Sequence, residues 1–252
     1  MRLFGEIGIG YEGMMRQSLS HFMSKGRTAS PTSEIPLPIQ VLSVPHSSMM
    51  TVEDLLRSNV QLRATTLSVM NRHHYGELYV NYLKARHAVF IVAKRWKLPE
   101  VDGMEYDQYD TPEARWVVVH EYGEVLAGLR MTPTTSRCGA HSYMIRDAQL
   151  GLLKGLPLDP LYFEAPVADQ IWEGTRMFVS DKIPASRRVK IQTLLMMQMA
   201  ETARSLEVTQ MIGIVPVVFR RWLKRIDMQA VAVGPAFEIG GDWSQAAMMR
   251  IG

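Results

Sequence analysis

The chain has 252 residues, of which 47% are hydrophobic, and a formal net charge of +3 at pH 7. This composition can bury a sizeable core in one domain. The longest apolar run, near residues 211–219, is far shorter than the ~20 residues that cross a bilayer, and the first residues lack the apolar core of a signal peptide. A single cysteine, Cys138, excludes an intramolecular disulfide. These features predict a cytoplasmic protein without a membrane span.

Residues 1–69 are expected to form an N-terminal extension that is partly a linker or disordered. Residues 24–48 are rich in Ser, Thr and Pro and have too few large apolar side chains to build a core. A short helix is expected over residues 52–70. Residues 70–252 are expected to form the folded domain.

Within this domain, apolar residues recur at helical spacing from Tyr75 to Lys97, and Pro99 ends the run. Residues 115–120 and 125–132 are typical of two strands joined in a hairpin. Further along, we expect a short helix over 144–150, a strand over 171–179, a long helix over 186–205, a strand over 210–215, a helix over 217–226, and strands over 228–238 and 246–251. A strand meander followed by alternating helices and strands predicts an α+β three-layer sandwich around a mixed sheet.

The segment 103–110 places three carboxylates, Glu105, Asp107 and Asp110, within six positions. Like charges this close need cationic partners, so the segment is either part of an ion-pair network or the lining of a site for a positively charged substrate. In an extended chain Glu105 and Asp107 share one face, whereas Asp110 points elsewhere unless the chain turns. Arg130, at the end of a strand-like run, is one expected partner.

Glu173 and Arg176 lie three positions apart in another strand-like segment. A regular strand would place them on opposite faces, and a bulge at Gly174 would bring them together. A buried ion pair is one interpretation of these two residues. The other is a site in which backbone N–H groups of the bulge point at a substrate oxygen.

Five elements together resemble the signature of the acyl-homoserine-lactone synthases, the LuxI-type autoinducer synthases. They are Arg86 to Phe90, Trp96, residues 103–110, Gly128-Leu129-Arg130 and Glu173-x-x-Arg176. Their order and spacing match over about residues 70–245. The resemblance implies a GNAT-like fold, which is a three-layer α/β/α sandwich around a mixed, mostly antiparallel, twisted sheet.

The resemblance also implies a reaction. An N-acyl-homoserine lactone, a quorum-sensing signal, would be made from S-adenosylmethionine (SAM) and an acyl thioester, with release of methylthioadenosine. The thioester would be carried by acyl carrier protein or by coenzyme A. SAM is then a substrate, and no cofactor, metal or covalent nucleophile is expected. The protein must supply orientation, a route for the ammonium proton and an anionic surface for the cationic substrate.

Roles follow from the same resemblance. The expected catalytic residues are Glu105, Asp107, Asp110, Arg130, Glu173 and Arg176. The expected substrate-binding residues are Arg86, Phe90, Trp96 and Gly213. Glu173 is the expected acid/base residue, and the two aromatic rings would close over the adenine or methionine part of SAM. The alternatives are an ion-pair lattice that holds the N-terminal helix on the sheet, and aromatic rings that belong to the core.

Gly213 bears on the acyl chain. In the resembling family, a threonine in this strand accompanies 3-oxo acyl donors. Glycine has no hydroxyl, so a buried 3-oxo group would lose a hydrogen bond worth ~1 kcal/mol. We therefore expect donors that are unsubstituted at C3, with medium to long chains tolerated. Methionines at 196, 197 and 199 are expected to line the core or an acyl tunnel.

Basic side chains gather between residues 187 and 225, with eight Lys or Arg against two Glu, a local net charge of +6. The expected docking residues for acyl carrier protein, which is acidic, are Arg187, Arg188, Arg221 and Arg225. The alternatives are a solvated basic face or a nucleic-acid-binding module, but the carboxylate block argues against nucleic acid as a partner. The alternative enzyme is a GNAT-like N-acyltransferase that acts on another amine. Cys138 and His141 have no second ligand pair, so we expect no metal site.

Overall fold

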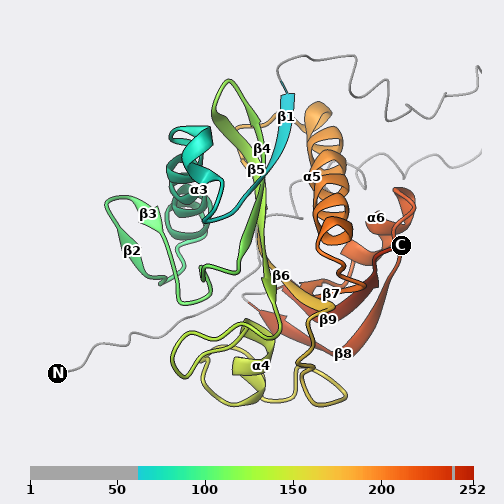
Figure 1. Ribbon diagram of the computed structural model, residues 1–252. Coiled ribbons are helices and arrows are strands. Elements are labelled where there is room, and N and C mark those ends of the chain that lie inside the picture. Colours follow the sequence, from blue (N-terminus) through green and yellow to red (C-terminus); the bar gives the residue numbers. More distant parts are fainter. Residues whose placement is uncertain (1–61, 240–241) are drawn as a thin grey trace, which may run out of the picture.

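The structure is a computed structural model that describes residues 62–239 and 242–252 (Figure 1). Within these residues, a seven-stranded sheet has the order β1-β4-β5-β6-β7-β9-β8. Its strands are β1 (Leu62–Leu67), β4 (Arg115–Glu121), β5 (Glu124–Pro133), β6 (Ile171–Val179), β7 (Gln210–Pro216), β8 (Ala230–Ile239) and β9 (Asp242–Arg250). Neighbouring strands are antiparallel, except that β6 and β7 are parallel. A second sheet pairs β2 (Glu100–Val101) with β3 (Met104–Glu105).

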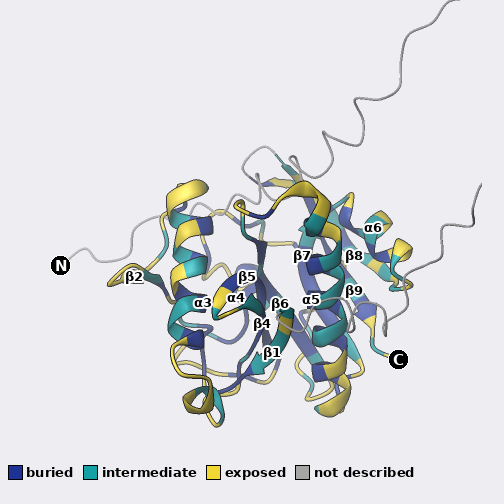
Figure 2. Ribbon diagram, turned by 90° about the horizontal axis from the view of Figure 1, so that it is seen from above, coloured by how far each residue is buried: buried dark blue, intermediate teal, exposed yellow. Residues whose placement is uncertain are grey.

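Helices cover both faces of the large sheet. On one face lie α3 (Leu78–Arg86) and α4 (Met144–Gln149), and on the other lie α5 (Ala185–Ser205) and α6 (Phe219–Arg225). Figure 2 shows α3 and α5 on opposite sides of the buried strands, with their exposed residues turned outward. The predicted three-layer α/β/α sandwich around a mixed, mostly antiparallel sheet is therefore confirmed. No helix in the described ranges is long and apolar enough to cross a membrane.

Apolar spacing explains why these helices pack on the sheet. In α5, Ile191, Leu195 and Met199 are buried and recur every four residues, which places them on one face of the helix. On the other side of the sheet, α3 packs closely because Gly128 of β5 has no side chain. A Cβ at Gly128 would lie 2.6 Å from a ring carbon of Tyr82, so the ring occupies the space a side chain would need.

Of two local predictions near the start of the described chain, one is wrong and the other holds only in part. The helix expected over 52–70 is a strand where it can be described, because Leu62–Leu67 pairs with β4 along its whole length. The rest of that prediction, and the extension expected over residues 1–69, fall mostly on residues 1–61, which lie outside the described residues. The continuous helix expected from Tyr75 to Lys97 is instead a 3-10 turn, α3 and a π-helix at His87–Ala93. Gly76, with φ of 55°, separates the turn from α3.

The sheet opens between β6 and β7. These parallel strands pair only from Ile171 to Glu173 against Gln210 to Ile212, and then separate. Beyond the last pair, the backbone groups of β6 that face β7 are not used by the sheet ladder. The strands, the hairpin and the helices expected after residue 115 are otherwise confirmed to within a few residues at their ends.

Candidate active site

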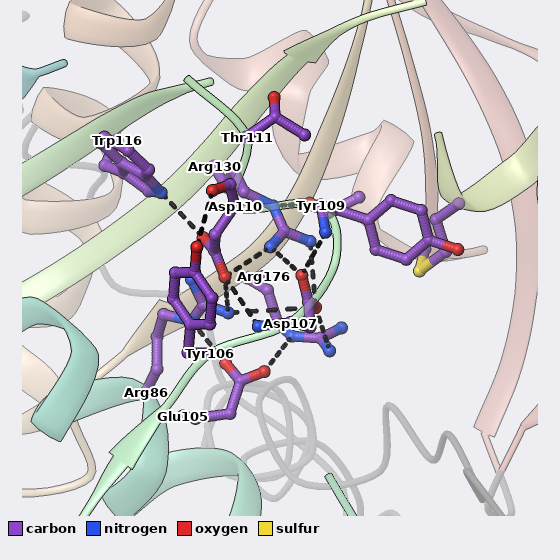
Figure 3. Close-up of polar contacts among 12 residues, drawn as sticks. Arg86, Glu105, Tyr106, Asp107, Tyr109, Asp110, Thr111, Trp116, Arg130 and Arg176 are labelled. Atoms are coloured by element: carbon purple, nitrogen blue, oxygen red, sulfur yellow. Dashed lines mark hydrogen bonds and ion pairs between the residues drawn. The ribbon is translucent and has the colours of Figure 1, made fainter. Parts of the chain in front are cut away.

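Six buried charged residues form a closed network between α3, the segment after β3 and the sheet (Figure 3). Each arginine contacts two of the carboxylates at 3.3 Å or less. Arg86 of α3 binds Glu105 and Asp110, Arg130 of β5 binds Asp107 and Asp110, and Arg176 of β6 binds Glu105 and Asp107. We refer to these six residues as the charged network. The structure thus brings together five of the six charged residues expected to be catalytic, together with Arg86, and leaves Glu173 outside.

A tight turn brings Asp110 into the charged network. The backbone N–H of Asp110 donates to the carbonyl of Asp107 at 3.1 Å, and the N–H of Asp107 donates to Oδ2 of Asp110 at 3.0 Å. Tyr109 N–H donates to Oδ1 of Asp107 at 2.9 Å, which is an Asx-type turn. The indole N–H of Trp116 donates to Oδ1 of Asp110 at 2.9 Å. The sequence did not settle whether the chain turns before Asp110. It does turn, and Asp110 therefore joins the other two carboxylates in facing the arginines.

The charges of the network cancel. Burial alone would raise the pKa of Asp110, but Arg130 and Arg86 outweigh it and hold the pKa well below its ordinary value. For Asp107 burial likewise opposes ionisation, and Arg130 and Arg176 keep the pKa lowered. Three acidic side chains face three arginine side chains, so the formal charges of the network sum to zero. It ties α3 to the sheet, and a catalytic role for its members stays a prediction.

Glu173 is not part of this network. It is 0% exposed, and its two oxygens accept the backbone N–H groups of Met144 at 2.9 Å and Ile145 at 2.8 Å, in the first turn of α4. Among the described residues it has no ion-pair partner, so the interpretation of Glu173 and Arg176 as a buried ion pair is wrong. Burial raises the pKa of Glu173 to about 7, although the two N–H groups and Arg130 act in the opposite direction. Glu173 is therefore a carboxyl group that can gain and lose a proton near neutral pH.

A bulge in β6 aims Arg176 at the network. In the pairing of β6 with β5, Thr175 lies opposite Arg130 and Phe178 lies opposite Gly128. Two residues of β6, Arg176 and Met177, therefore face one residue of β5. Arg176 has φ of 52°, in the left-handed region. The sequence suggested a bulge at Gly174. The bulge exists, but it lies two residues further along, at Arg176. It turns Arg176 away from the alternation of a regular strand and toward Glu105 and Asp107.

The two aromatic rings expected at the substrate lie in the core. Phe90 and Trp96 are 1% and 6% exposed, and their rings stack with centroids 5.0 Å apart. The guanidinium of Arg176 lies 5.7 Å from the centre of the Phe90 ring. The Phe90 ring thus packs against Arg176 of the charged network, and the Trp96 ring stacks on Phe90. Closure of these rings over SAM stays a prediction.

An apolar pocket of about 90 Å³ lies between β6, β7, α5 and α6. Its lining includes Gly174, Gly213, Met177, Met196, Met199 and Met211. Two of the three methionines expected to line a tunnel, those at 196 and 199, are in it, whereas Met197 is not. A Cβ on Gly213 would lie only 2.8 Å from the carbonyl oxygen of Gly174, so a side chain here would push the two strands apart. The close approach of two glycines is what shapes this end of the pocket.

Comparison with known proteins identifies the family. A sequence profile described as autoinducer synthase matches residues 68–251, which is most of the chain. The chain belongs to the autoinducer synthase family. This confirms the predicted membership of the LuxI-type acyl-homoserine-lactone synthases.

Individual relatives agree with this. The isovaleryl-homoserine lactone synthase of Bradyrhizobium diazoefficiens is 31% identical over 114 residues, covering 45% of this chain and 47% of that protein. The chain thus aligns with about half the length of that relative. The acyl-homoserine-lactone synthase of Ralstonia solanacearum is 30% identical over 162 residues, covering 62% of this chain and 74% of that protein. The solved structure of the CoA-dependent acyl-homoserine lactone synthase BjaI, with SAM and isopentyl-CoA, has a TM-score of 0.60 at 22% identity, covering 76% of this chain and 84% of that one.

The four arginines expected to dock a carrier protein differ in their exposure and contacts. Arg188 is 7% exposed and donates to the carbonyls of Ile183 and Asp181, so it fixes the turn before α5 and is not available for docking. Arg187 is partly exposed and pairs with Glu121 at 3.1 Å. Arg221 and Arg225 are exposed on α6, which packs beside the second half of α5. Arg187 at the start of α5 and the two arginines of α6 therefore lie on separate parts of the protein surface.

Sequence reasoning missed a second polar cluster, which lies around α4. Asp147 of α4 is 0% exposed, accepts hydrogen bonds from Tyr109 and Ser142, and lies with Oδ2 2.8 Å from Nδ1 of His141. A lone carboxylate in the apolar stretch that becomes α4 was the available signal. Among the described residues, no three His, Cys, Asp or Glu side chains are grouped to hold a metal ion. Cys138 and His141 are instead joined by two backbone hydrogen bonds of 2.9 and 3.0 Å.

Proposed function

We propose that this autoinducer synthase is an acyltransferase that joins an acyl thioester to SAM, forms an N-acyl-homoserine lactone and releases methylthioadenosine. The position of Glu173 in β6 is the observation that supports this most. Its carboxylate is held by α4, whereas the next residue, Gly174, lines the apolar pocket. An acid/base residue therefore lies between a polar site and an apolar pocket, as transfer of an acyl chain to an amine requires.

We place the amino-acid end of SAM at a small cavity beside the charged network, which at about 10 Å³ has room for about one water and must widen to admit it. Asp107, Tyr109, Met144 and Arg176 contribute to its lining, so we call it the network cavity. Arg176 offers N–H donors to a carboxylate, and Asp107 offers an anionic acceptor to an ammonium. Because the charged network is neutral as a whole, it matches a zwitterionic group better than a simple cation. The α-amine of SAM would then lie toward Glu173, whose backbone donor Met144 lines the same cavity.

The chemistry follows from these positions. Glu173, with a pKa of about 7, accepts a proton from the ammonium near neutral pH. The free amine attacks the thioester carbonyl, a C–N bond forms, and the C–S bond breaks to release the thiol. The SAM carboxylate then displaces the sulfonium at the γ-carbon and closes the lactone. The sulfonium leaves as a neutral thioether, so this second step needs no nucleophile from the protein.

Acyl carrier protein is the proposed donor, with a chain that is unsubstituted at C3. Arg221 and Arg225 are exposed and stand four positions apart on α6, so an acidic partner can contact both. Gly213 lines the apolar pocket and offers no hydroxyl to a 3-oxo group. Coenzyme A is the alternative carrier, since the BjaI structure is named as CoA-dependent and contains isopentyl-CoA.

Mixing the protein with SAM and matched acyl donors tests this proposal. Mass spectrometry should detect an acyl-homoserine lactone, with a lower KM for acyl carrier protein than for acyl-coenzyme A. Reversing both Arg221 and Arg225 to Glu should raise the KM for the carrier protein and leave that for SAM unchanged. The matched control is Arg63→Glu, an exposed charge on β1 at the opposite edge of the sheet, which should change neither. A lower KM for coenzyme A, or equal effects of both variants, would remove the carrier protein from the proposal.

A further inference from the structure

The second polar cluster forms a hydrogen-bonded chain from the network cavity toward the surface. The hydroxyl of Tyr109 donates to Oδ2 of Asp147 at 2.8 Å. The same oxygen lies 2.8 Å from Nδ1 of His141. Tyr109 is 3% exposed and lines the network cavity, Asp147 is 0% exposed, and the His141 side chain is 33% exposed. The chain therefore begins at the cavity, passes through a buried carboxylate and ends at an imidazole in contact with solvent.

The side chains of this hydrogen-bonded chain are held in place by separate contacts. Ser142 donates to Oδ1 of Asp147 through its backbone N–H at 3.0 Å and its hydroxyl at 2.9 Å, which leaves Oδ2 to Tyr109 and His141. His141 is fixed by the two backbone hydrogen bonds to Cys138 across a short turn in which Gly139 has φ of 60°. The Tyr109 hydroxyl points away from the charged network (Figure 3), and it donates to Asp147. The alignment is thus built from three separate segments of the chain.

The proposed reaction needs an exit for one proton. The ammonium of SAM carries three N–H protons, of which the amide keeps one and the departing thiol takes one. The third must reach solvent in each turnover. Glu173 is fully buried, and the charged network is paired within itself, so neither delivers a proton to solvent directly.

We propose that Tyr109, Asp147 and His141 form a proton relay that carries the third ammonium proton from the network cavity to solvent. This inference rests on the proposed function. The Tyr109 oxygen accepts a proton as its own hydroxyl proton passes to Oδ2 of Asp147. His141, in the tautomer that carries its proton on Nε2, takes this proton on Nδ1 and releases the one on Nε2 to solvent. Burial and the neighbouring Asp147 raise the pKa of Tyr109 far above its ordinary value, so the hydroxyl stays protonated at the start and end of each cycle.

One member of the relay, Asp147, lies in the helix that binds Glu173. Asp147 lies in α4, and the first-turn N–H groups of the same helix bind the Glu173 carboxylate. After burial and Asp147, the charge of Glu173 also raises the pKa of Tyr109, so Glu173 lies near the start of the relay. His141, the titratable member in contact with solvent, faces Asp147 and the edge of the Tyr109 ring, whose centre is 6.2 Å from its own.

Replacing His141 with Ala tests the relay in the full-length protein, with lactone formation as the readout. We expect kcat to fall about tenfold or more, within the range of general acid–base effects, with an unchanged KM for SAM and an unchanged melting temperature. Added imidazole should restore kcat of His141→Ala in proportion to its concentration. Tyr109→Phe should lower kcat without rescue, and the double variant should be no slower than Tyr109→Phe, because both changes break one chain.

His87→Ala is the matched control, since it removes a histidine that also pairs with a carboxylate, Glu100, at 2.5 Å. It should leave kcat unchanged and insensitive to imidazole. A His141→Ala variant with normal kcat would overturn the relay, and so would a slow variant that imidazole does not restore, because that result indicates a structural role. A wild-type protein that forms no lactone would instead refute the proposed function, and the relay with it.

Discussion

Replacing Glu173 with Gln should change how stability depends on pH. Burial raises the pKa of this carboxyl from its ordinary value of 4.5 to about 7 in the folded protein. The folded state therefore binds the proton more tightly than the unfolded state. Its contribution to stability is fully present below pH 4.5 and is lost as the pH rises through about 7. Glutamine carries no charge and has no such dependence.

The size of the effect follows from the two pKa values. Each pH unit between them corresponds to about 1.4 kcal/mol, so the wild-type protein should lose about 2 to 3 kcal/mol relative to Glu173→Gln between pH 5 and pH 8. The variant also carries a constant penalty at every pH. Both oxygens of Glu173 accept a backbone N–H, and the amide can accept only one of them through its oxygen.

Urea unfolding at several pH values measures this difference. We expect the free energies of unfolding of the two proteins to converge or cross as the pH rises from 5 to 8. Glu201→Gln, which removes a carboxylate whose side chain is 68% exposed, is the control and should run parallel to the wild type. Parallel curves for wild type and Glu173→Gln would show that the burial of Glu173 does not shift its pKa, and would refute the reasoning.

Three further substitutions test the structure around the site. Asp107→Asn should lower the free energy of unfolding by ~3–5 kcal/mol in urea, because it leaves buried arginines without a full partner, and a near-normal value would contradict the network. Thr132→Val should keep or raise stability by up to ~1 kcal/mol, because the buried Thr132 hydroxyl has no hydrogen-bond partner among the described residues; a clear loss would contradict this. Gly213→Thr should reduce lactone formation from all donors, because its Cβ meets the carbonyl of Gly174 at 2.8 Å, and full activity with a gain of 3-oxo products would count against that contact.

Much of the fold could be predicted from local patterns. The hairpin of β4 and β5 is marked by two apolar runs around a short turn, and α5 is marked by apolar residues at helical spacing. By contrast, β1 is short, and only its pairing with β4 makes Leu62–Leu67 a strand, which is a long-range contact. The π-helix at His87–Ala93 likewise extends a helical pattern without a residue that signals the change.

The site was predictable as a set of charges but not as a set of pairs. The spacing of Glu105, Asp107 and Asp110 demanded cations, and the structure supplies them. The partner of Glu173 was not predictable, because it is a pair of backbone N–H groups in α4. Such groups are present in any sequence and leave no signal in it. The sequence suggested a bulge at Gly174 because glycine has the greatest backbone freedom. In the structure Arg176 adopts the left-handed conformation instead, and its ion pairs with Glu105 and Asp107 hold it there.

Counting products in one reaction tests the proposed chemistry. With SAM and an acyl thioester both present, methylthioadenosine, free thiol and acyl-homoserine lactone should appear in equal amounts, and omission of the thioester should abolish methylthioadenosine. Release of thiol with an open-chain amide, and without methylthioadenosine, would contradict the account, because it would show acyl transfer to the SAM amine without closure of the lactone.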